Sequence, residues 1–256
     1  MLLLLLACST PTGTGSTGSS APAPMKPATC TLLTVNDTYQ IEGLPDQTGG
    51  IARLRTLRKQ IEKESGPVVV LHAGDMLAPS LPSRTFGGDQ MIDSLNRLDG
   101  DPQAMDERLV VVFGNHEFDA SKEADGPKLD ARIEASQFTW LDSSIVWGRN
   151  AEGQPIVAAP NLVGTRLVDC QGVKLGIFGL TINSKKAAFV DDFREPVSMA
   201  RAQSEALRKA GAEVVIGLTH QTFGEDQQLL KTLGDLGPDF IVGGHEHVHM
   251  TTNVGR

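Results

Sequence analysis

Short apolar runs recur along this chain, and a polar residue able to bind a metal ion closely follows most of them. The runs are continuous rather than alternating, which is typical of strands buried on both faces of a sheet. They span Thr31–Val35, Val68–Leu71, Leu109–Phe113, Lys174–Phe178, Val214–Leu218 and Phe240–Val242. Stretches with helical spacing separate them, at residues 50–64, 90–98, 203–210 and 227–233. This alternation predicts an α/β fold in which helices cover the sheet structure on both faces.

The charge of the chain limits the partners it can bind. The 256 residues carry a formal net charge of −8 and contain no long basic run. A polynucleotide partner requires a positive surface that displaces counterions from phosphates, so we expect no nucleic acid polymer as partner. An acidic protein can still bind a small phosphorylated substrate if metal ions supply the local positive charge.

The polar residues that follow the strands share one kind of chemistry. Carboxyl ends of strands collect functional groups in sheets of this class, and the side chains found there offer oxygen or nitrogen donors. They are Asp37, Asp75, Asn115, His220 and His245, with His247 two residues further along. The sequence therefore predicts a metal centre at the edge of the sheet structure.

The order of these residues is similar to the signature of the calcineurin-like metallophosphoesterases. The matching blocks are Asp37, Gly74-Asp75, Gly114-Asn115-His116-Glu117, His220 and Gly244-His245-Glu246-His247. The run from Gly114 to Asp119, and Thr219-His220 with Asp226, resemble the 5'-nucleotidase branch of that family. The resemblance implies an α/β sandwich of two packed mixed β-sheets flanked by helices. It also implies a cofactor of two divalent metal ions, drawn from Mn, Zn, Fe and Co.

The resemblance further implies a role for each matched residue. Asp37, Asp75 and His247 would hold one ion, and Asp75, Asn115, His220 and His245 would hold the other, with Asp75 as the bridge. His116 resembles the catalytic histidine of the family, which stabilises the transferring phosphoryl group and protonates the leaving group. Asp119 resembles the residue that orients this imidazole, although an aspartate at this position could instead cap the N-terminus of a helix.

Tyr39 departs from the commoner family pattern, in which a histidine stands two residues after the first aspartate. A phenolate could bind a metal directly, the phenol could hydrogen-bond a metal-bound water, or the ring could pack at the rim. Direct ligation needs the ion to displace the phenol proton, which trivalent iron does best. We expect one of the other two uses, which places Tyr39 in the outer shell.

The N-terminal residues predict export and a lipid anchor. Residues 1–8 resemble the end of a signal with a lipobox, in which Cys8 is lipidated, and a chance apolar start is the alternative. Residues 9–28 are rich in Ser, Thr, Gly, Pro and Ala and read as a flexible tether, which leaves residues 29–256 for the metallophosphoesterase domain. We expect a periplasmic or cell-surface lipoprotein of a bacterium, attached to membrane only through this anchor.

Cys30 and Cys170 are the cysteines left once Cys8 is assigned to lipidation. They could pair in an oxidising compartment, or remain two independent buried thiols. Sequence does not show whether their Cα atoms approach closely enough to bridge, and we expect the independent thiols.

These features together predict metal-dependent hydrolysis of a 5'-nucleotide or similar phosphomonoester. A sugar-nucleotide pyrophosphatase and a sulfur-ester hydrolase are alternatives within the same class of enzyme. A tethered, metal-containing binding lipoprotein with little or no turnover is the alternative outside it. The family's nucleotidases carry a C-terminal domain that stacks the nucleobase, and the short stretch after His247 leads us to expect a fold truncated at its C-terminal edge.

Overall fold

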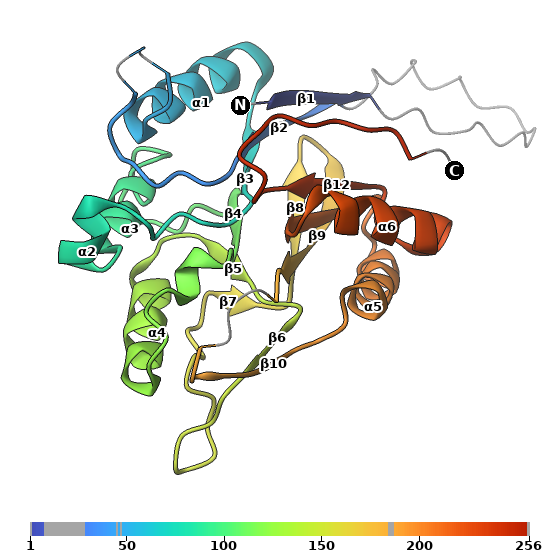
Figure 1. Ribbon diagram of the computed structural model, residues 1–256. Coiled ribbons are helices and arrows are strands. Elements are labelled where there is room, and N and C mark those ends of the chain that lie inside the picture. Colours follow the sequence, from blue (N-terminus) through green and yellow to red (C-terminus); the bar gives the residue numbers. More distant parts are fainter. Residues whose placement is uncertain (1, 8–28, 45, 47, 184–186, 255–256) are drawn as a thin grey trace, which may run out of the picture.

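Two β-sheets form the centre of the computed structural model, which describes residues 2–7, 29–44, 46, 48–183 and 187–254 (Figure 1). The first sheet has the order β1-β2-β3-β4-β5-β7. Its strands are β1 (Leu2–Ala7), β2 (Thr29–Val35), β3 (Val68–His72), β4 (Leu109–Val112), β5 (Thr139–Leu141) and β7 (Leu162–Val163). Strands β2, β3, β4, β5 and β7 pair in parallel with one another, and β1 pairs antiparallel with β2. The sheet is therefore mixed, as predicted.

The second sheet has the order β12-β11-β9-β8. Its strands are β8 (Thr165–Cys170), β9 (Val173–Thr181), β11 (Val214–His220) and β12 (Phe240–Gly243). Strands β9, β11 and β12 are parallel, whereas β8 and β9 form an antiparallel hairpin. A separate ribbon pairs β6 (Ile145–Trp147) with β10 (Val190–Phe193).

The apolar runs fill three layers of core. Leu32, Val69 and Val110 of the first sheet pack with Ile177 and Ile216 of the second, in a layer between the two sheets. Successive residues of a strand point to opposite faces, which is why both faces of these strands are apolar. Continuous apolar runs are therefore the pattern that this arrangement requires.

The helices cover the two outer faces (Figure 1). Against the first sheet lie α1 (Ile51–Ser65), α3 (Asp89–Leu95) and α4 (Gly126–Ala135), and against the second lie α5 (Pro196–Lys209) and α6 (Phe223–Leu233). The remaining helical segments are α2 (Leu81–Phe86) and the 3-10 turns η1 (His116–Phe118), η2 (Glu123–Asp125) and η3 (Gly234–Leu236). The predicted sandwich of two packed sheets flanked by helices is confirmed.

Several elements differ from the sequence prediction. Helix α5 begins at Pro196 rather than near residue 203, with the side chain of Glu195 accepting hydrogen bonds from the backbone of Val197 and Ser198. Strands β5, β6 and β7 have two or three residues each, too few for a recognisable apolar run. Residues 2–7, expected to belong to a signal, pair with β2 as strand β1. Cys8 and the tether of residues 9–28 lie outside the described residues, so lipidation stays a prediction.

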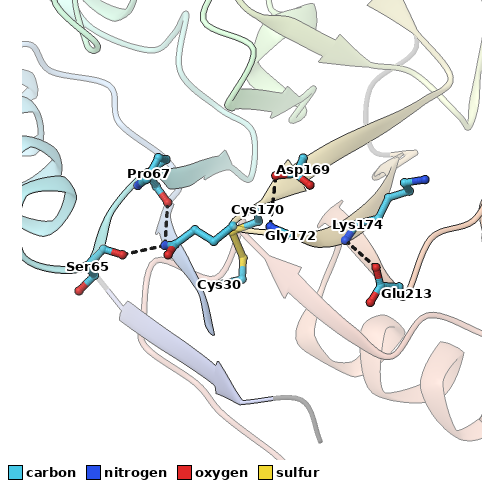
Figure 2. The surroundings of a disulfide bond; sticks show 9 residues. Cys30, Ser65, Pro67, Asp169, Cys170, Gly172, Lys174 and Glu213 are labelled. Carbon is cyan, nitrogen blue, oxygen red and sulfur yellow. Dashed lines mark hydrogen bonds between the residues drawn. A yellow bond between two sulfur atoms is a disulfide. The ribbon is translucent and has the colours of Figure 1, made fainter. Parts of the chain in front are cut away.

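Cys30 and Cys170 form a disulfide, which corrects the expectation of two independent thiols (Figure 2). Cys30 lies in β2 and Cys170 ends β8, and the packing of the two sheets brings their Cα atoms to 5.3 Å. This distance lies within the range that a disulfide spans. The bond joins the two sheets across a sequence separation of 140 residues.

The disulfide lies beside the turn at Gln171-Gly172, which joins β8 to β9. Gln171 extends from that turn to donate hydrogen bonds to the backbone carbonyls of Ser65 and Pro67, which precede β3 (Figure 2). The contact between the sheets is therefore both covalent and hydrogen-bonded at this end. Among the described helices, none has the length and apolar character needed to cross a membrane.

Candidate metal centre

Loops from both sheets meet at the carboxyl ends of the strands. The first sheet contributes the residues that follow β2, β3 and β4, and the second contributes the end of β11 and the loop after β12. All six predicted ligands lie in these positions: Asp37, Asp75, Asn115, His220, His245 and His247. Because the sheets pack face to face, donors separated by up to 210 residues come within hydrogen-bond distance.

Left-handed backbone conformations are concentrated at this centre. Among the described non-glycine residues, five have positive φ, and four of them are predicted ligands. Their φ angles are 52° at Asp37, 57° at Asp75, 79° at His245 and 53° at His247. Such conformations cost on the order of 1–3 kcal/mol each and persist only where the surroundings impose them. Their concentration here supports the assignment of this region as a functional site.

Glycines permit the two sheets to approach closely at the centre. A Cβ atom on Gly74 would lie 2.6 Å from Nδ1 of His220, and one on Gly114 would lie 2.1 Å from Oδ1 of Asp75. Both distances are shorter than non-bonded atoms tolerate, and Gly74 also has a φ of 83°. The glycine that precedes Asp75 and the one that precedes Asn115 are therefore required by close packing as well as by the turn.

One group of donors surrounds Asp37. Nε2 of His247 lies 3.1 Å from Oδ1 of Asp37, and the backbone N–H of His245 donates to Oδ2 of Asp37 at 3.0 Å. The hydroxyl of Tyr39 lies 2.9 Å from Oδ1 of Asp37, 3.2 Å from Oδ2 of Asp75 and 2.9 Å from Nε2 of His247. Burial and then the charges of Asp37 and Asp75 raise the pKa of Tyr39, so without a cation the phenol stays protonated.

A second group of donors lies on the other side of Asp75. Nε2 of His220 lies 3.2 Å from Oδ2 of Asp75, the same oxygen that faces Tyr39. Nδ1 of His245 lies 3.1 Å from Oδ1 of Asn115. The rings of His220 and His245 meet edge to face with centroids 5.2 Å apart. Oδ2 of Asp75 is thus shared by both groups, as a bridging ligand would be.

The tautomer of His220 suits metal binding. Nδ1 lies 2.7 Å from the carbonyl oxygen of Ala73 and donates to it, which directs the other nitrogen toward the centre. That Nε2 is buried without a hydrogen bond of good geometry, although Asp75 is near. Burial lowers the pKa of His220, but the hydrogen bond and charge of Asp75 outweigh it and raise the pKa overall. A cation would replace the proton between these two side chains.

The residues present therefore fit a metal site. Ligand atoms of Asp37, Asp75 and His220 lie within 4.8 Å of one another. Asp75 and His220 are buried, and burying ionisable groups side by side is costly unless they are paired or coordinate a metal. Carboxylate, amide and imidazole donors suit Mn, Fe or Zn ions.

His116 and Asp119 form a pair at the edge of this centre. Nδ1 of His116 lies 2.8 Å from Oδ2 of Asp119, and Nε2 lies 3.9 Å from Oδ2 of Asp75. The His116 side chain is 26% exposed, so its Nε2 faces the centre from the solvent side. Asp119 ends the turn η1 and does not begin a helix, which removes the alternative reading of Asp119 as a helix N-cap.

Glu117 is a buried residue of the site to which sequence analysis assigned no role. One carboxylate oxygen accepts from the backbone N–H of Asp75 and Gly114, at 2.9 and 2.6 Å. The other accepts from Met76 and Leu77, at 2.8 and 3.0 Å. Burial and the charge of Asp75 raise the pKa of Glu117, and these hydrogen bonds oppose the shift. The only sequence feature that could have indicated this role is the position of Glu117 inside the Gly114–Glu117 block, next to the predicted ligand Asn115 and the predicted catalytic His116.

His72 supports the loop that carries Asp37. Its Nε2 lies 2.6 Å from the hydroxyl oxygen of Thr38, between Asp37 and Tyr39, and the side chain is fully buried. Burial lowers the pKa of His72 to about 4, so the ring is neutral at physiological pH. The structure places His72 behind the centre rather than among its donors.

Asp226 lies at the start of α6, under the end of β11. Its Oδ2 accepts from the hydroxyl of Thr219 at 2.9 Å, and its Oδ1 is buried without a hydrogen-bond partner. Burial raises the pKa of Asp226 to about 7. The Asp226 carboxyl packs beneath the loop that begins at Gly243. A Cβ atom added to Gly243 would lie 2.7 Å from Oδ2 of Asp226.

Known proteins resemble this chain in both sequence and fold. The 5'-nucleotidase of Rattus norvegicus is 28% identical over 214 residues, covering 80% of this chain and 33% of that protein. The snake venom 5'-nucleotidase of Gloydius brevicauda is 26% identical over 216 residues, covering 81% of this chain and 33% of that protein. The chain therefore spans about a third of the length of these curated relatives.

Solved structures share the fold. The 5'-nucleotidase precursor from Thermus thermophilus superposes with a TM-score of 0.66 at 22% identity, covering 87% of this chain and 42% of that chain. The model of one family, calcineurin-like phosphoesterase, matches residues 31–249, which include every donor described above. The chain belongs to the calcineurin-like phosphoesterase family.

Proposed function

We propose that this protein is a metal-dependent hydrolase of phosphomonoesters, with a nucleoside 5'-phosphate as the preferred kind of substrate. The observation that supports this most directly is the convergence of six donor residues, Asp75 among them, at the carboxyl ends of the strands, with the imidazole of His116 facing the Asp75 carboxylate. The curated relatives are 5'-nucleotidases, which supports the choice of substrate class.

Two divalent ions, when bound, supply positive charge for the phosphate oxygens and acidify the attacking water. The chain's own residues position the catalytic imidazole and protonate the leaving group. The Asp119 carboxylate accepts a hydrogen bond from the Nδ1–H of His116 and so holds the imidazole with Nε2 toward the centre. Protonated His116 donates a hydrogen bond to the transferring phosphoryl group and passes its proton to the leaving oxygen. Water and ester thus give phosphate and an alcohol.

The ligand division follows the two groups of donors. Asp37, Asp75 and His247 would hold one ion, and Asp75, Asn115, His220 and His245 would hold the other. The shared Oδ2 of Asp75, 3.2 Å from Nε2 of His220 and 3.2 Å from the Tyr39 hydroxyl, supports a bridging role. His116 is partly exposed and His247 is exposed, which leaves this side of the centre open to a small substrate.

We also propose that the protein acts outside the cytoplasm, as a periplasmic or cell-surface lipoprotein acylated at Cys8. The disulfide between Cys30 and Cys170 supports an oxidising compartment.

Chelation tests the proposed function. Thorough treatment with a chelator should abolish release of phosphate from a nucleoside 5'-monophosphate, and Mn²⁺, Zn²⁺ or Co²⁺ should restore it. A matched pair of variants separates the centre from nearby histidines: His247→Ala should need more metal for activity, whereas His249→Ala, at an exposed position beyond the centre, should not. Activity that persists in metal-free protein contradicts the proposal. Metal binding without any turnover would favour the binding lipoprotein instead.

A further inference from the structure

Glu246 stands between two predicted ligands, His245 and His247, in the loop that follows β12. Its side chain contacts helix α6, where Oε1 accepts a hydrogen bond from the backbone N–H of Phe223 at 2.8 Å. Phe223 is the first residue of that helix, so its N–H has no acceptor within the helix. The carboxylate of Glu246 therefore joins the loop of two ligands to the helix that follows β11.

Helix α6 does not depend on Glu246 for its cap. The side chain of Thr222 accepts from the N–H of Glu225, and the carboxylate of Glu225 accepts from the N–H of Thr222. This reciprocal pair is a complete capping box. The bond from Glu246 is thus an additional contact between the loop and the helix, and the positive end of the helix dipole favours a carboxylate there.

The loop has few other attachments. The backbone N–H groups of Gly244 and His245 donate to a carbonyl of β11 and to the carboxylate that follows β2, at 3.1 and 3.0 Å. Both groups precede Glu246. In residues 247–254, no backbone group hydrogen-bonds to another described residue. Glu246 is therefore the last attachment of the loop before His247, whose side chain is 58% exposed.

The residues on either side of Glu246 have left-handed backbones, with φ of 79° at His245 and 53° at His247. Residues other than glycine keep such conformations only where the surrounding structure imposes them. Under the proposed function, one of these histidines holds each ion. The attachment between them therefore fixes the direction of a ligand to each metal position.

We propose, on the basis of the proposed function, that Glu246 is a positioning residue of the metal centre. Its hydrogen bond to α6 holds His245 and His247 in the directions in which each binds a different ion. Glu246 itself acts through these two ligands rather than on the substrate. Loss of a residue that orients metal ligands typically lowers metal affinity by about 10–100-fold, and we expect a loss of that size at both positions.

The hydrogen bond can be removed from either side. Glu246→Ala deletes the acceptor and Phe223→Pro deletes the donor, whereas Glu246→Gln keeps an acceptor oxygen on a side chain of equal length. Proline suits the first position of a helix, and Thr222, with φ −65° and ψ 148°, has the extended backbone that a following proline requires. Phe223→Ala is the matched control, because it removes the ring and keeps the N–H.

Titration of metal-free protein with Mn²⁺ by isothermal calorimetry measures the effect. Glu246→Ala and Phe223→Pro should each weaken the binding of both ions by about 10–100-fold, and combining them should add little because both remove one bond. Glu246→Gln and Phe223→Ala should remain within about three-fold of the unaltered protein. Glu225→Ala removes the capping box from the same end of α6, so it should lower the urea stability of metal-free protein without weakening Mn²⁺ binding.

Each contrary result is distinguishable. Unchanged Mn²⁺ affinity in Glu246→Ala and Phe223→Pro overturns the positioning role and leaves the proposed function intact. A loss that Glu246→Gln shares, or that Phe223→Pro does not reproduce, means that the carboxylate does not act through this bond. An equal loss in Glu225→Ala assigns the effect to helix stability and also overturns the proposal.

The two sides of the bond protect the test against misfolding. If either Glu246→Ala or Phe223→Pro does not fold, the other decides the question with its own matched control. If the unaltered protein binds no Mn²⁺, the proposed function fails and the positioning role fails with it.

Discussion

Replacing Glu117 by glutamine tests the hydrogen-bond network that fixes Asp75. The glutamate accepts four backbone N–H groups, two at each carboxylate oxygen. Glutamine keeps one oxygen and so retains one pair. Its NH₂ group then faces the other pair, placing donors against donors.

The size of the effect follows from this count. An unsatisfied buried donor costs about 1–3 kcal/mol, so two of them predict a loss of about 2–6 kcal/mol in the free energy of unfolding. This is a large part of the roughly 5–15 kcal/mol that stabilises a typical domain. The loss should appear in metal-free protein, because the four bonds involve no metal.

Urea unfolding of metal-free, oxidised protein measures this difference. Glu134→Gln is a matched control, since it makes the same chemical change at an exposed position of α4. The result also decides the protonation of Glu117, whose pKa is raised by burial. A protonated Glu117 resembles glutamine, so unfolding free energies within about 0.5 kcal/mol of the unaltered protein would refute the account of a carboxylate held by four donors.

Three further predictions concern the centre and its support. His116→Asn should keep its metal but lose about two to four orders of magnitude in turnover, whereas Asn115→Ala should lose metal; elemental analysis with steady-state kinetics distinguishes them. Replacing Cys30 and Cys170 by alanine removes a cross-link over a separation of 140 residues and should lower the unfolding free energy in urea by about 2–5 kcal/mol. Asp226 has a pKa raised to about 7 by burial, so its folded form binds more protons than its unfolded form, and its contribution to stability falls as pH rises from about 4 to about 7. Asp226→Asn should therefore gain in melting temperature over the unaltered protein between about pH 5 and about pH 8, and an unchanged difference would argue against this titration.

The sequence predicts the sandwich well because strands buried on both faces have continuous apolar runs, which are easily recognised. Val69 and Val70 point to different cores, one between the sheets and one beneath the helices, so neither position tolerates a polar side chain. Strands such as β6 and β7 leave no such mark, since a strand of two or three residues fits many local patterns.

The candidate donors of the centre could be named from the sequence because each lies at or just after the end of a strand that the sequence reveals. The arrangement of these donors in space could not be predicted from the sequence, because it depends on contacts between the two sheets. The left-handed backbone at Asp75 and His245 follows from tight loops whose shape no local pattern encodes. The four N–H groups that converge on Glu117 come from two separate loops, and backbone groups have no sequence signature.

Strand β2 connects the disulfide to the candidate metal centre. Cys30 lies near its beginning and is bonded to Cys170, which ends β8 at the turn of the β8–β9 hairpin. Asp37 follows its other end and contacts the loop after β12, the neighbour of β11 in the second sheet. The same two sheets are therefore held together covalently at one end and by converging donors at the other. Two carboxylates and three imidazoles meet at the second end, and a cation bound there would supply the sheet-to-sheet link that the disulfide supplies at the first.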